Sequence, residues 1–142
     1  MLEFEFVQIA IGNKDKFLGC PSDEDWKRLF YFAQKQSLLG FLFCGIERLP
    51  NEQRPKRELL LRWYAMTEII KKTNAKLNAR CAELYNILNE GHLKGCVLKG
   101  QGVALLYPKP EYRQSGDIDM WVGTSEYPRS EERFSRNAET DL

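Results

Sequence analysis

One amphipathic pattern, over about residues 58–90, constrains the fold of this chain more than any other feature. Apolar residues recur along it at steps of 4, 3, 4, 7, 4, 3 and 4, which is the spacing of one helix face: Leu59, Trp63, Met66, Ile70, Leu77, Cys81, Leu84 and Leu88. Gly91 supplies a stop at the C-terminal end. We therefore expect one long helix whose stripe is buried against the helices that precede it. The alternative is a coiled-coil surface for a partner.

Two shorter helices are expected before the long one. In PSDEDWKRLFYFAQKQ, Ser22 is a good N-cap, and the acidic residues after it suit the positive end of the helix dipole. The apolar residues of this helix follow at helical spacing: Trp26, Leu29, Phe30 and Ala33. It should end between Ser37 and Gly40. The segment FLFCGIERL then predicts a second helix that stops at Pro50, and NEQRPKR is the loop after it.

The N-terminal segment LEFEFVQIAIG fits two structures. Its loose alternation is typical of a strand, but a short helix would equally place Phe4, Val7 and Ile11 on one side. Periodicity alone leaves both open.

Composition limits the class of protein. Of the 142 residues, 43% are hydrophobic and 12% aromatic, which is enough for the core of one domain. The 21 basic and 20 acidic residues leave a net charge of +1, which argues against a dedicated nucleic-acid-binding protein. No apolar run reaches the roughly 20 residues of a membrane helix, and no signal peptide is evident, so we expect a cytoplasmic protein with no membrane partner.

The cysteines and the histidine form no metal-binding pattern. The four cysteines are widely spaced and include no CxxC pair, so reduced thiols are expected: Cys20, Cys44, Cys81 and Cys96. The single histidine, His92, stands alone beside Gly91. Neither a zinc site nor Cys–His catalysis therefore has a set of partners.

The sequence changes character after Gly91. GCVLKG, residues 95–100, is typical of a short buried strand ending at a glycine, and QGVALLYP is typical of a helix that begins at once. The loop KPEYRQSG then leads into a second expected strand, DIDMWV, residues 117–122. Residues i and i+2 of a strand share a face, so Asp117 and Asp119 would present their carboxylates side by side.

Two adjacent carboxylates need a partner, because like charges repel and lose hydration. Oxygen-only ligands suit Mg²⁺ or Mn²⁺, which also carry substrate phosphates. A glycine between a strand and a helix, here Gly100, lets backbone N–H groups approach a phosphate. The alternative is a pair of exposed carboxylates that cap loops or pair with Arg113.

The run LKGQGVALLYPKPEYRQSGDIDMWV resembles the signature of the uncharacterised bacterial nucleotidyltransferase family within the DNA polymerase beta-like superfamily. DEDWKRLFYFAQKQSLLGFLFCGIERL is similar to the helices that precede that signature, and the resemblance covers roughly residues 1–122. It implies an α+β fold. An N-terminal helical region with one long helix would occupy residues 1–94, and a partial nucleotidyltransferase β-sheet core residues 95–122. It also implies a helix for the N-terminal segment.

The resemblance further implies a reaction, in which a nucleoside monophosphate passes from an NTP to an acceptor hydroxyl and pyrophosphate leaves. The acceptor stays open between a protein, an RNA end and a small molecule. By this resemblance, the catalytic residues, which also bind Mg²⁺ or Mn²⁺, are Asp117 and Asp119. The residues that match the phosphate-binding part of the family's motif are Lys99, Gly100, Gln101 and Arg113.

Two departures from the family pattern matter. The superfamily's usual loop has Gly followed by Gly or Ser, whereas here Lys99 precedes a single Gly100, so Lys99 either contacts the phosphates or packs at the strand end. Arg113 likewise has two alternative roles, a catalytic one and a local ion pair. The superfamily also supplies a third acidic residue, and the polar tail, residues 123–142, offers acidic residues outside any strand pattern: Glu126, Glu131, Glu132, Glu139 and Asp141.

We therefore expect a truncated or degenerate copy of the catalytic core with a disordered tail. The alternative function is an inert remnant, acting as a helical interaction module or as a homodimer paired through an exposed sheet edge.

Overall fold

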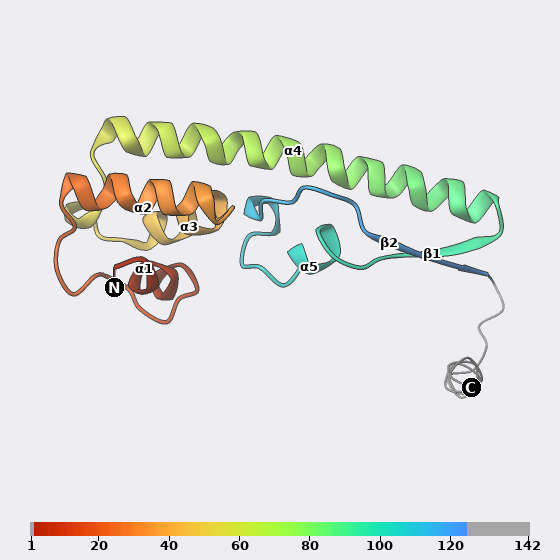
Figure 1. Ribbon diagram of the computed structural model, residues 1–142, viewed down its shortest axis with the longest axis horizontal. Coiled ribbons are helices and arrows are strands. Elements are labelled where there is room, and N and C mark those ends of the chain that lie inside the picture. The colour runs from red at the N-terminus through yellow and green to blue at the C-terminus, as the bar shows by residue number, and fades with distance from the viewer. Residues whose placement is uncertain (1, 125–142) are drawn as a thin grey trace, which may run out of the picture.

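The computed structural model describes residues 2–124, and its elements are arranged along one long helix (Figure 1). In chain order they are α1 Leu2–Ala10, α2 Asp23–Lys35, α3 Leu39–Arg48, the 3-10 turn η1 Asn51–Gln53, α4 Arg57–Glu90, β1 Leu93–Val97, α5 Gln101–Ala104, the 3-10 turn η2 Pro110–Tyr112 and β2 Met120–Thr124. Helices α1–α3 pack along the first half of α4, and β1, α5 and β2 lie along its second half. This arrangement confirms the expected α+β class.

Helix α2 begins where the sequence predicts. The Ser22 hydroxyl accepts a hydrogen bond from the backbone N–H of Asp25 at 3.2 Å, and the Asp25 carboxylate accepts from the backbone N–H of Ser22 at 3.0 Å. The Ser22 hydroxyl also donates to Oδ2 of Asp25 at 2.7 Å, and this bond, followed by the bond from the Ser22 backbone N–H, lowers the pKa of the Asp25 carboxyl. The helix ends at Lys35, slightly before the predicted limit, and Ser37 turns the chain with a φ of 56°.

Aromatic rings form the centre of the core around the first half of α4. The Phe6 ring centroid lies 5.4 Å from that of Trp26 and 5.9 Å from that of Trp63, both edge to face. Trp63 is fully buried, and its Nε1–H donates to the backbone oxygen of Leu39 at 2.9 Å. The apolar residues predicted for α2 all belong to this core: Trp26, Leu29, Phe30 and Ala33.

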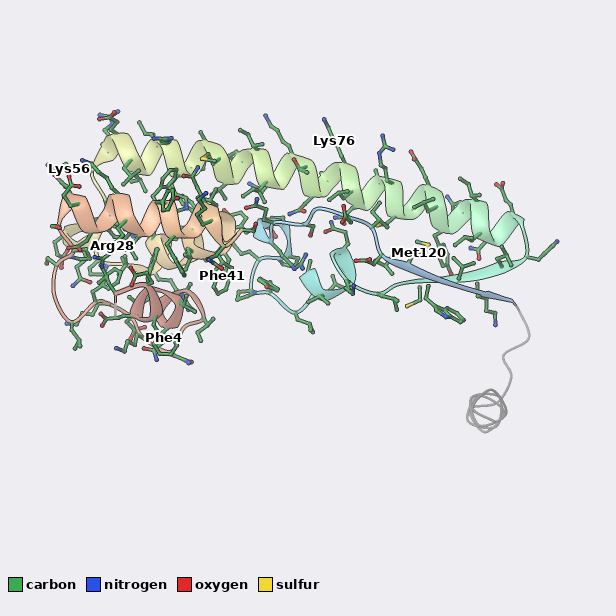
Figure 2. The ribbon with its side chains drawn as sticks, in the orientation of Figure 1. Phe4, Arg28, Phe41, Lys56, Lys76 and Met120 are labelled. Atoms are coloured by element: carbon green, nitrogen blue, oxygen red, sulfur yellow. The ribbon has the colours of Figure 1, made fainter. Side chains whose placement is uncertain are left out.

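The N-terminal segment is a helix, as the resemblance implied, and the side that carries Phe4 and Ile11 is not its buried side. Phe6 and Ile9 are fully buried, whereas Phe4 and Ile11 are exposed, and Figure 2 shows Phe4 on the outer side of α1. Both sets of residues have helical spacing, and Phe6 is the one that meets Trp26 and Trp63. Tertiary contact therefore decided between two faces that periodicity could not separate.

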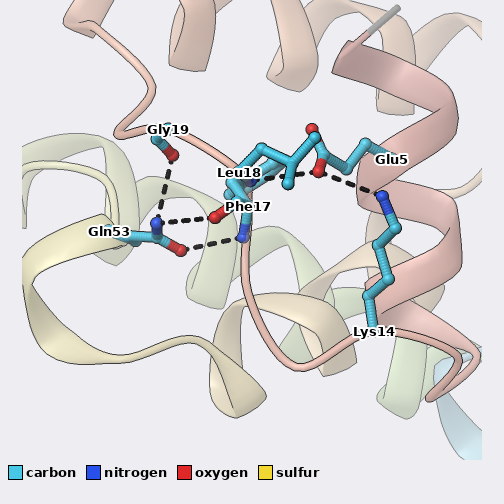
Figure 3. Close-up of polar contacts among 6 residues, drawn as sticks. All are labelled: Glu5, Lys14, Phe17, Leu18, Gly19 and Gln53. Carbon is cyan, nitrogen blue, oxygen red and sulfur yellow. Dashed lines mark hydrogen bonds and ion pairs between the residues drawn. The ribbon is translucent and has the colours of Figure 1, made fainter.

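A buried glutamine in the segment predicted as a loop holds the chain between α1 and α2. Gln53, at the end of η1, accepts a hydrogen bond from the N–H of Phe17 at 2.9 Å. Its side-chain amide donates to the carbonyls of Phe17 and Gly19 at 3.0 and 3.1 Å (Figure 3). Glu5 adds a bond from the N–H of Leu18 at 3.1 Å. One side chain thus satisfies three backbone groups of a connecting segment.

The apolar stripe of α4 is buried against the preceding helices only along its first half. Trp63 and Ile70 are buried, whereas Leu84 is 40% exposed. Helices α1–α3 are too short to cover the whole of α4, and its second half meets β1 and α5 instead. The expectation of a continuous buried stripe was therefore wrong for that half. The chain reverses at His92, whose φ is 56°.

Strands β1 and β2 form a two-stranded antiparallel ribbon among the described residues. The register runs from Leu93 opposite Thr124 to Val97 opposite Met120. Helix α5 is shorter than the predicted QGVALLYP segment, because turns replace it after Ala104.

In the part of the chain that is described, no helix is long and apolar enough to cross a membrane.

Candidate functional site

Asp117 and Asp119 lie on the extended segment that leads into β2. The strand itself begins at Met120, three residues later than predicted, because its partner β1 ends at Val97 and the chain then turns away. One further bond, from the N–H of Leu98 to the carbonyl of Asp119 at 2.9 Å, continues the ribbon pattern. The backbone of Asp119 is therefore held by the ribbon. Asp117 lies before the ribbon, so the strand alternation that predicted side-by-side carboxylates does not extend to it.

Gly100 brings residues 99–101, which the resemblance predicts to bind phosphate and which we call the phosphate-side loop, against the backbone of Asp117. Its φ of 60° and ψ of −108° are favourable only for glycine. A Cβ at this position would lie 2.8 Å from the carbonyl oxygen of Asp117. The glycine predicted to cradle phosphate and the first of the two carboxylate residues are therefore direct neighbours.

Lys99 extends from the same loop toward the second carboxylate. Its Nζ lies 3.9 Å from Oδ1 of Asp119, and the two side chains are 76% and 45% exposed. Lys99 was expected either to contact the phosphates or to pack at the strand end, and a side chain this exposed is not packed. An ion pair this exposed is weak, so the ammonium group is available to another anion.

Gln101 and Arg113 are engaged with other parts of the structure. The Gln101 side-chain amide donates to Oδ1 of Asn78, on α4, at 2.6 Å. The Arg113 guanidinium donates from Nη1 to the hydroxyl of Ser115 at 2.7 Å and lies 5.8 Å from the ring centroid of Tyr107. Within residues 2–124 the ion-pair alternative for Arg113 finds no carboxylate partner.

One residue beside the site was missed by sequence reasoning. Asn74 is 2% exposed, and its amide nitrogen donates to the carbonyls of Glu111 and Arg113 at 2.7 Å each. A signal was present in the stripe of α4, where the step of 7 from Ile70 to Leu77 skips the helical position at 74. A polar residue in an otherwise apolar phase indicates a buried hydrogen-bonding role.

A family model described as an uncharacterised nucleotidyltransferase matches residues 22–138. The chain belongs to this nucleotidyltransferase family. The match confirms the resemblance, although it begins after α1 and extends beyond Val122, the limit estimated from the sequence. Membership supports a general role in nucleotidyl transfer. No curated protein and no solved structure matches the chain.

Asp117 and Asp119 are the candidate cation ligands in the described part of the chain. Asp117 is exposed and Asp119 half-exposed, so both can reach a cation from solvent, and carboxylate oxygens are the ligands that Mg²⁺ and Mn²⁺ prefer. Among residues 2–124 no group of three or more His, Cys, Asp or Glu side chains is placed to hold a metal ion. The acidic residues of the tail lie outside the described residues: Glu126, Glu131, Glu132, Glu139 and Asp141.

Proposed function

We propose that this chain is a metal-dependent nucleotidyltransferase, which transfers a nucleoside monophosphate from an NTP to an acceptor hydroxyl with release of pyrophosphate. The observation that carries the proposal is the close approach of Gly100 to the carbonyl oxygen of Asp117. It brings a glycine suited to phosphate against the backbone of a residue whose carboxylate is suited to a cation, in a member of a nucleotidyltransferase family.

Asp117 and Asp119 would hold Mg²⁺ or Mn²⁺ in this proposal. When bound, the ion neutralises phosphate charge and favours attack by the acceptor hydroxyl. The remaining contributions come from the chain itself. Gly100 lets the backbone approach a phosphate closely, because it has no side chain. Lys99 would exchange its weak pair with Asp119 for the more highly charged triphosphate.

The same proposal assigns a role to each region of the chain. Residues 1–94 would form a helical region that supports the site, residues 95–122 would carry the first part of the catalytic core, and residues 123–142 would form a polar tail. The acceptor is a protein, an RNA end or a small molecule. The two carboxylates suit either Mg²⁺ or Mn²⁺, since both ions take oxygen ligands.

Calorimetric titration of ATP, GTP, CTP and UTP, with and without Mg²⁺, tests the proposal. The wild type should bind at least one NTP in a Mg²⁺-dependent manner, and the double variant Asp117→Asn with Asp119→Asn should not. A matched control is Asp15→Asn with Glu52→Gln, which makes the same change in net charge at two exposed positions among the N-terminal helices. It should bind like the wild type.

The second candidate is an inert remnant that acts as an interaction module or homodimer. It is favoured by Leu105 and Leu106, which follow α5 and are 77% and 83% exposed. Absence of NTP binding in folded protein, together with a dimeric mass by light scattering that Leu105→Ser with Leu106→Ser reduces to a monomer, would support this candidate over the first.

A further inference from the structure

Asn74 lies at the middle of α4, where the helical core ends and the candidate site begins. Its side chain is buried, and its Nδ2 group donates to the carbonyls of Glu111 and Arg113, each at 2.7 Å. These two carbonyls flank Tyr112, and the chain reaches Asp117 four residues after Arg113. One side chain therefore uses both of its hydrogens to fix the segment that leads to the carboxylates.

The same turn of α4 also holds the phosphate-side loop. Nε2 of Gln101 donates to the backbone oxygen of Asn74 at 3.3 Å and to Oδ1 of Asn78 at 2.6 Å. Gln101 directly follows Gly100, so its anchor lies one residue from the predicted phosphate contact. Both halves of the candidate site are thus tied to residues 74–78 of one rigid helix.

The segment held by Asn74 is fixed from a second side by α3. A Cβ at Gly40 would lie 2.1 Å from the carbonyl oxygen of Tyr112, so the two backbones are in close contact. The Tyr112 side chain is itself buried, with its ring centroid 6.3 Å from that of Phe43. Asn74 and α3 therefore hold this segment from two sides.

A polar residue at position 74 gives up apolar burial. A leucine at this position would continue the apolar stripe of α4, and burial of an amide costs free energy that its hydrogen bonds must offset. Here Nδ2 alone is hydrogen bonded, since Oδ1 has no partner among the described residues. The bonds of Asn74 go to two carbonyls of a distant segment, not to its own helix. The Asn74 side chain therefore holds that distant segment in place and does not stabilise its own helix.

Resting on the proposed function, we infer that Asn74 is a positioning residue of the nucleotidyl-transfer site. It sets the distance between the phosphate-side loop, residues 99–101, and the carboxylate segment, residues 117–119, by holding the approach to both on one turn of α4. A displacement of about 1 Å in such a site can reduce catalysis by roughly a hundredfold, so this role matters without contact to substrate.

Amide hydrogen exchange tests the anchoring without any nucleotide. Asn74→Asp keeps the size of the side chain but removes the donor and places a carboxylate against two carbonyls. We expect exchange at least about tenfold faster at the hydrogen-bonded amides of Tyr112 and Arg113. Exchange within α2 should stay at the wild-type rate. Asn86→Asp, at an exposed position of the same helix, is the control and should change neither.

Asn78→Ala is a milder variant that separates the two anchors. Asn78 is exposed, so the protein should fold normally, and only the phosphate-side loop loses a partner. Faster exchange is expected at the amides of Gly102 and Ala104, without change at Tyr112. Asn86→Ala is its control. Wild-type exchange at all of these amides in both Asn74→Asp and Asn78→Ala would overturn the inference.

Binding of ATP, GTP, CTP and UTP with Mg²⁺ then separates this inference from the proposed function. We expect Asn74→Asp to weaken the NTP that binds the wild type by about tenfold or more. If the variant binds as tightly as the wild type, the positioning role is overturned and the proposed function stands. If the wild type binds no NTP, the proposed function fails and the positioning role fails with it, and exchange then reports only the structural anchor.

Discussion

The ammonium nitrogen of Lys99 lies 3.9 Å from a carboxylate oxygen of Asp119, and both side chains are open to solvent. This pair connects the loop that follows β1 with the segment that precedes β2, whose backbones also meet through Gly100 and Asp117. An exposed pair contributes about 0–1 kcal/mol to stability. Its position therefore matters more than its strength, because it places a cation beside the candidate metal ligands.

Lys99→Gln should weaken Mg²⁺-dependent NTP binding by about tenfold, since a charge-assisted contact to phosphate is lost. The free energy of unfolding should change by less than about 0.5 kcal/mol, because the side chain is exposed. Calorimetry and urea denaturation measure the two effects. Lys76→Gln is the control, since Lys76 points away from the site on the outer side of α4 (Figure 2), and it should bind like the wild type. Equal NTP affinity in Lys99→Gln and the wild type would exclude a phosphate contact by this lysine.

Gly100→Ala should abolish NTP binding and leave the helical core intact. The new Cβ meets the carbonyl oxygen of Asp117 at 2.8 Å, and the backbone at φ 60° is strained for alanine by about 1–3 kcal/mol. Circular dichroism should be unchanged, while calorimetry should show no heat of binding. Gly116→Ala, one residue before Asp117, is a matched control, because a Cβ there has no neighbour within 4 Å. Wild-type affinity in Gly100→Ala would contradict the proposed role of the loop.

Cys44 should resist alkylation in the native protein. Burial raises the pKa of its thiol to about 11 from an ordinary value of 9.0, so at pH 8 only about one molecule in a thousand carries the reactive thiolate. Cys20 and Cys96 are exposed and should be modified by iodoacetamide, as read by peptide mass spectrometry. Modification of Cys44 at the rate of Cys20 would show that the site is not buried.

The raised pKa of Cys44 also fixes the sign of a pH effect on stability. The native state keeps the proton that the unfolded thiol loses near pH 9.0, so this contribution is complete below that pH and is lost as the pH rises toward about 11. Cys44→Ala should reduce the fall in the free energy of unfolding over this interval, as measured by urea denaturation.

Gln53→Ala should lower the free energy of unfolding by about 2 kcal/mol, because it leaves three backbone groups of Phe17 and Gly19 without their partner. Urea denaturation followed by tryptophan fluorescence measures this loss. Gln36→Ala, at an exposed position after α2, should change stability by less than about 0.5 kcal/mol. Equal stability of the two variants would mean that water replaces the Gln53 bonds at no cost.

Local chemistry was predictable from the sequence. The cap at Ser22 and the buried side of α2 depend on residues within a few positions of one another, and both were predicted correctly. The long helix was also predicted, because its pattern extends over many turns.

Features set by distant contacts were not predictable in the same way. The buried face of α1 depends on Trp26 and Trp63, and the start of β2 depends on where β1 ends. Asn74 was missed because the apolar stripe was followed from Ile70 directly to Leu77. Its importance comes from two carbonyls more than 35 positions away in the chain, which sequence periodicity does not report.

The most direct test of the metal–nucleotide site uses Mn²⁺ as a paramagnetic probe. The longitudinal relaxation rate of water protons is measured in a solution of Mn²⁺ and NTP as protein is added. This rate should rise with the wild type, as Mn²⁺–NTP binds to a slowly tumbling protein. It should not rise with Asp117→Asn and Asp119→Asn combined. An equal rise with both proteins, or no rise with folded wild type, would contradict a site built on Asp117 and Asp119.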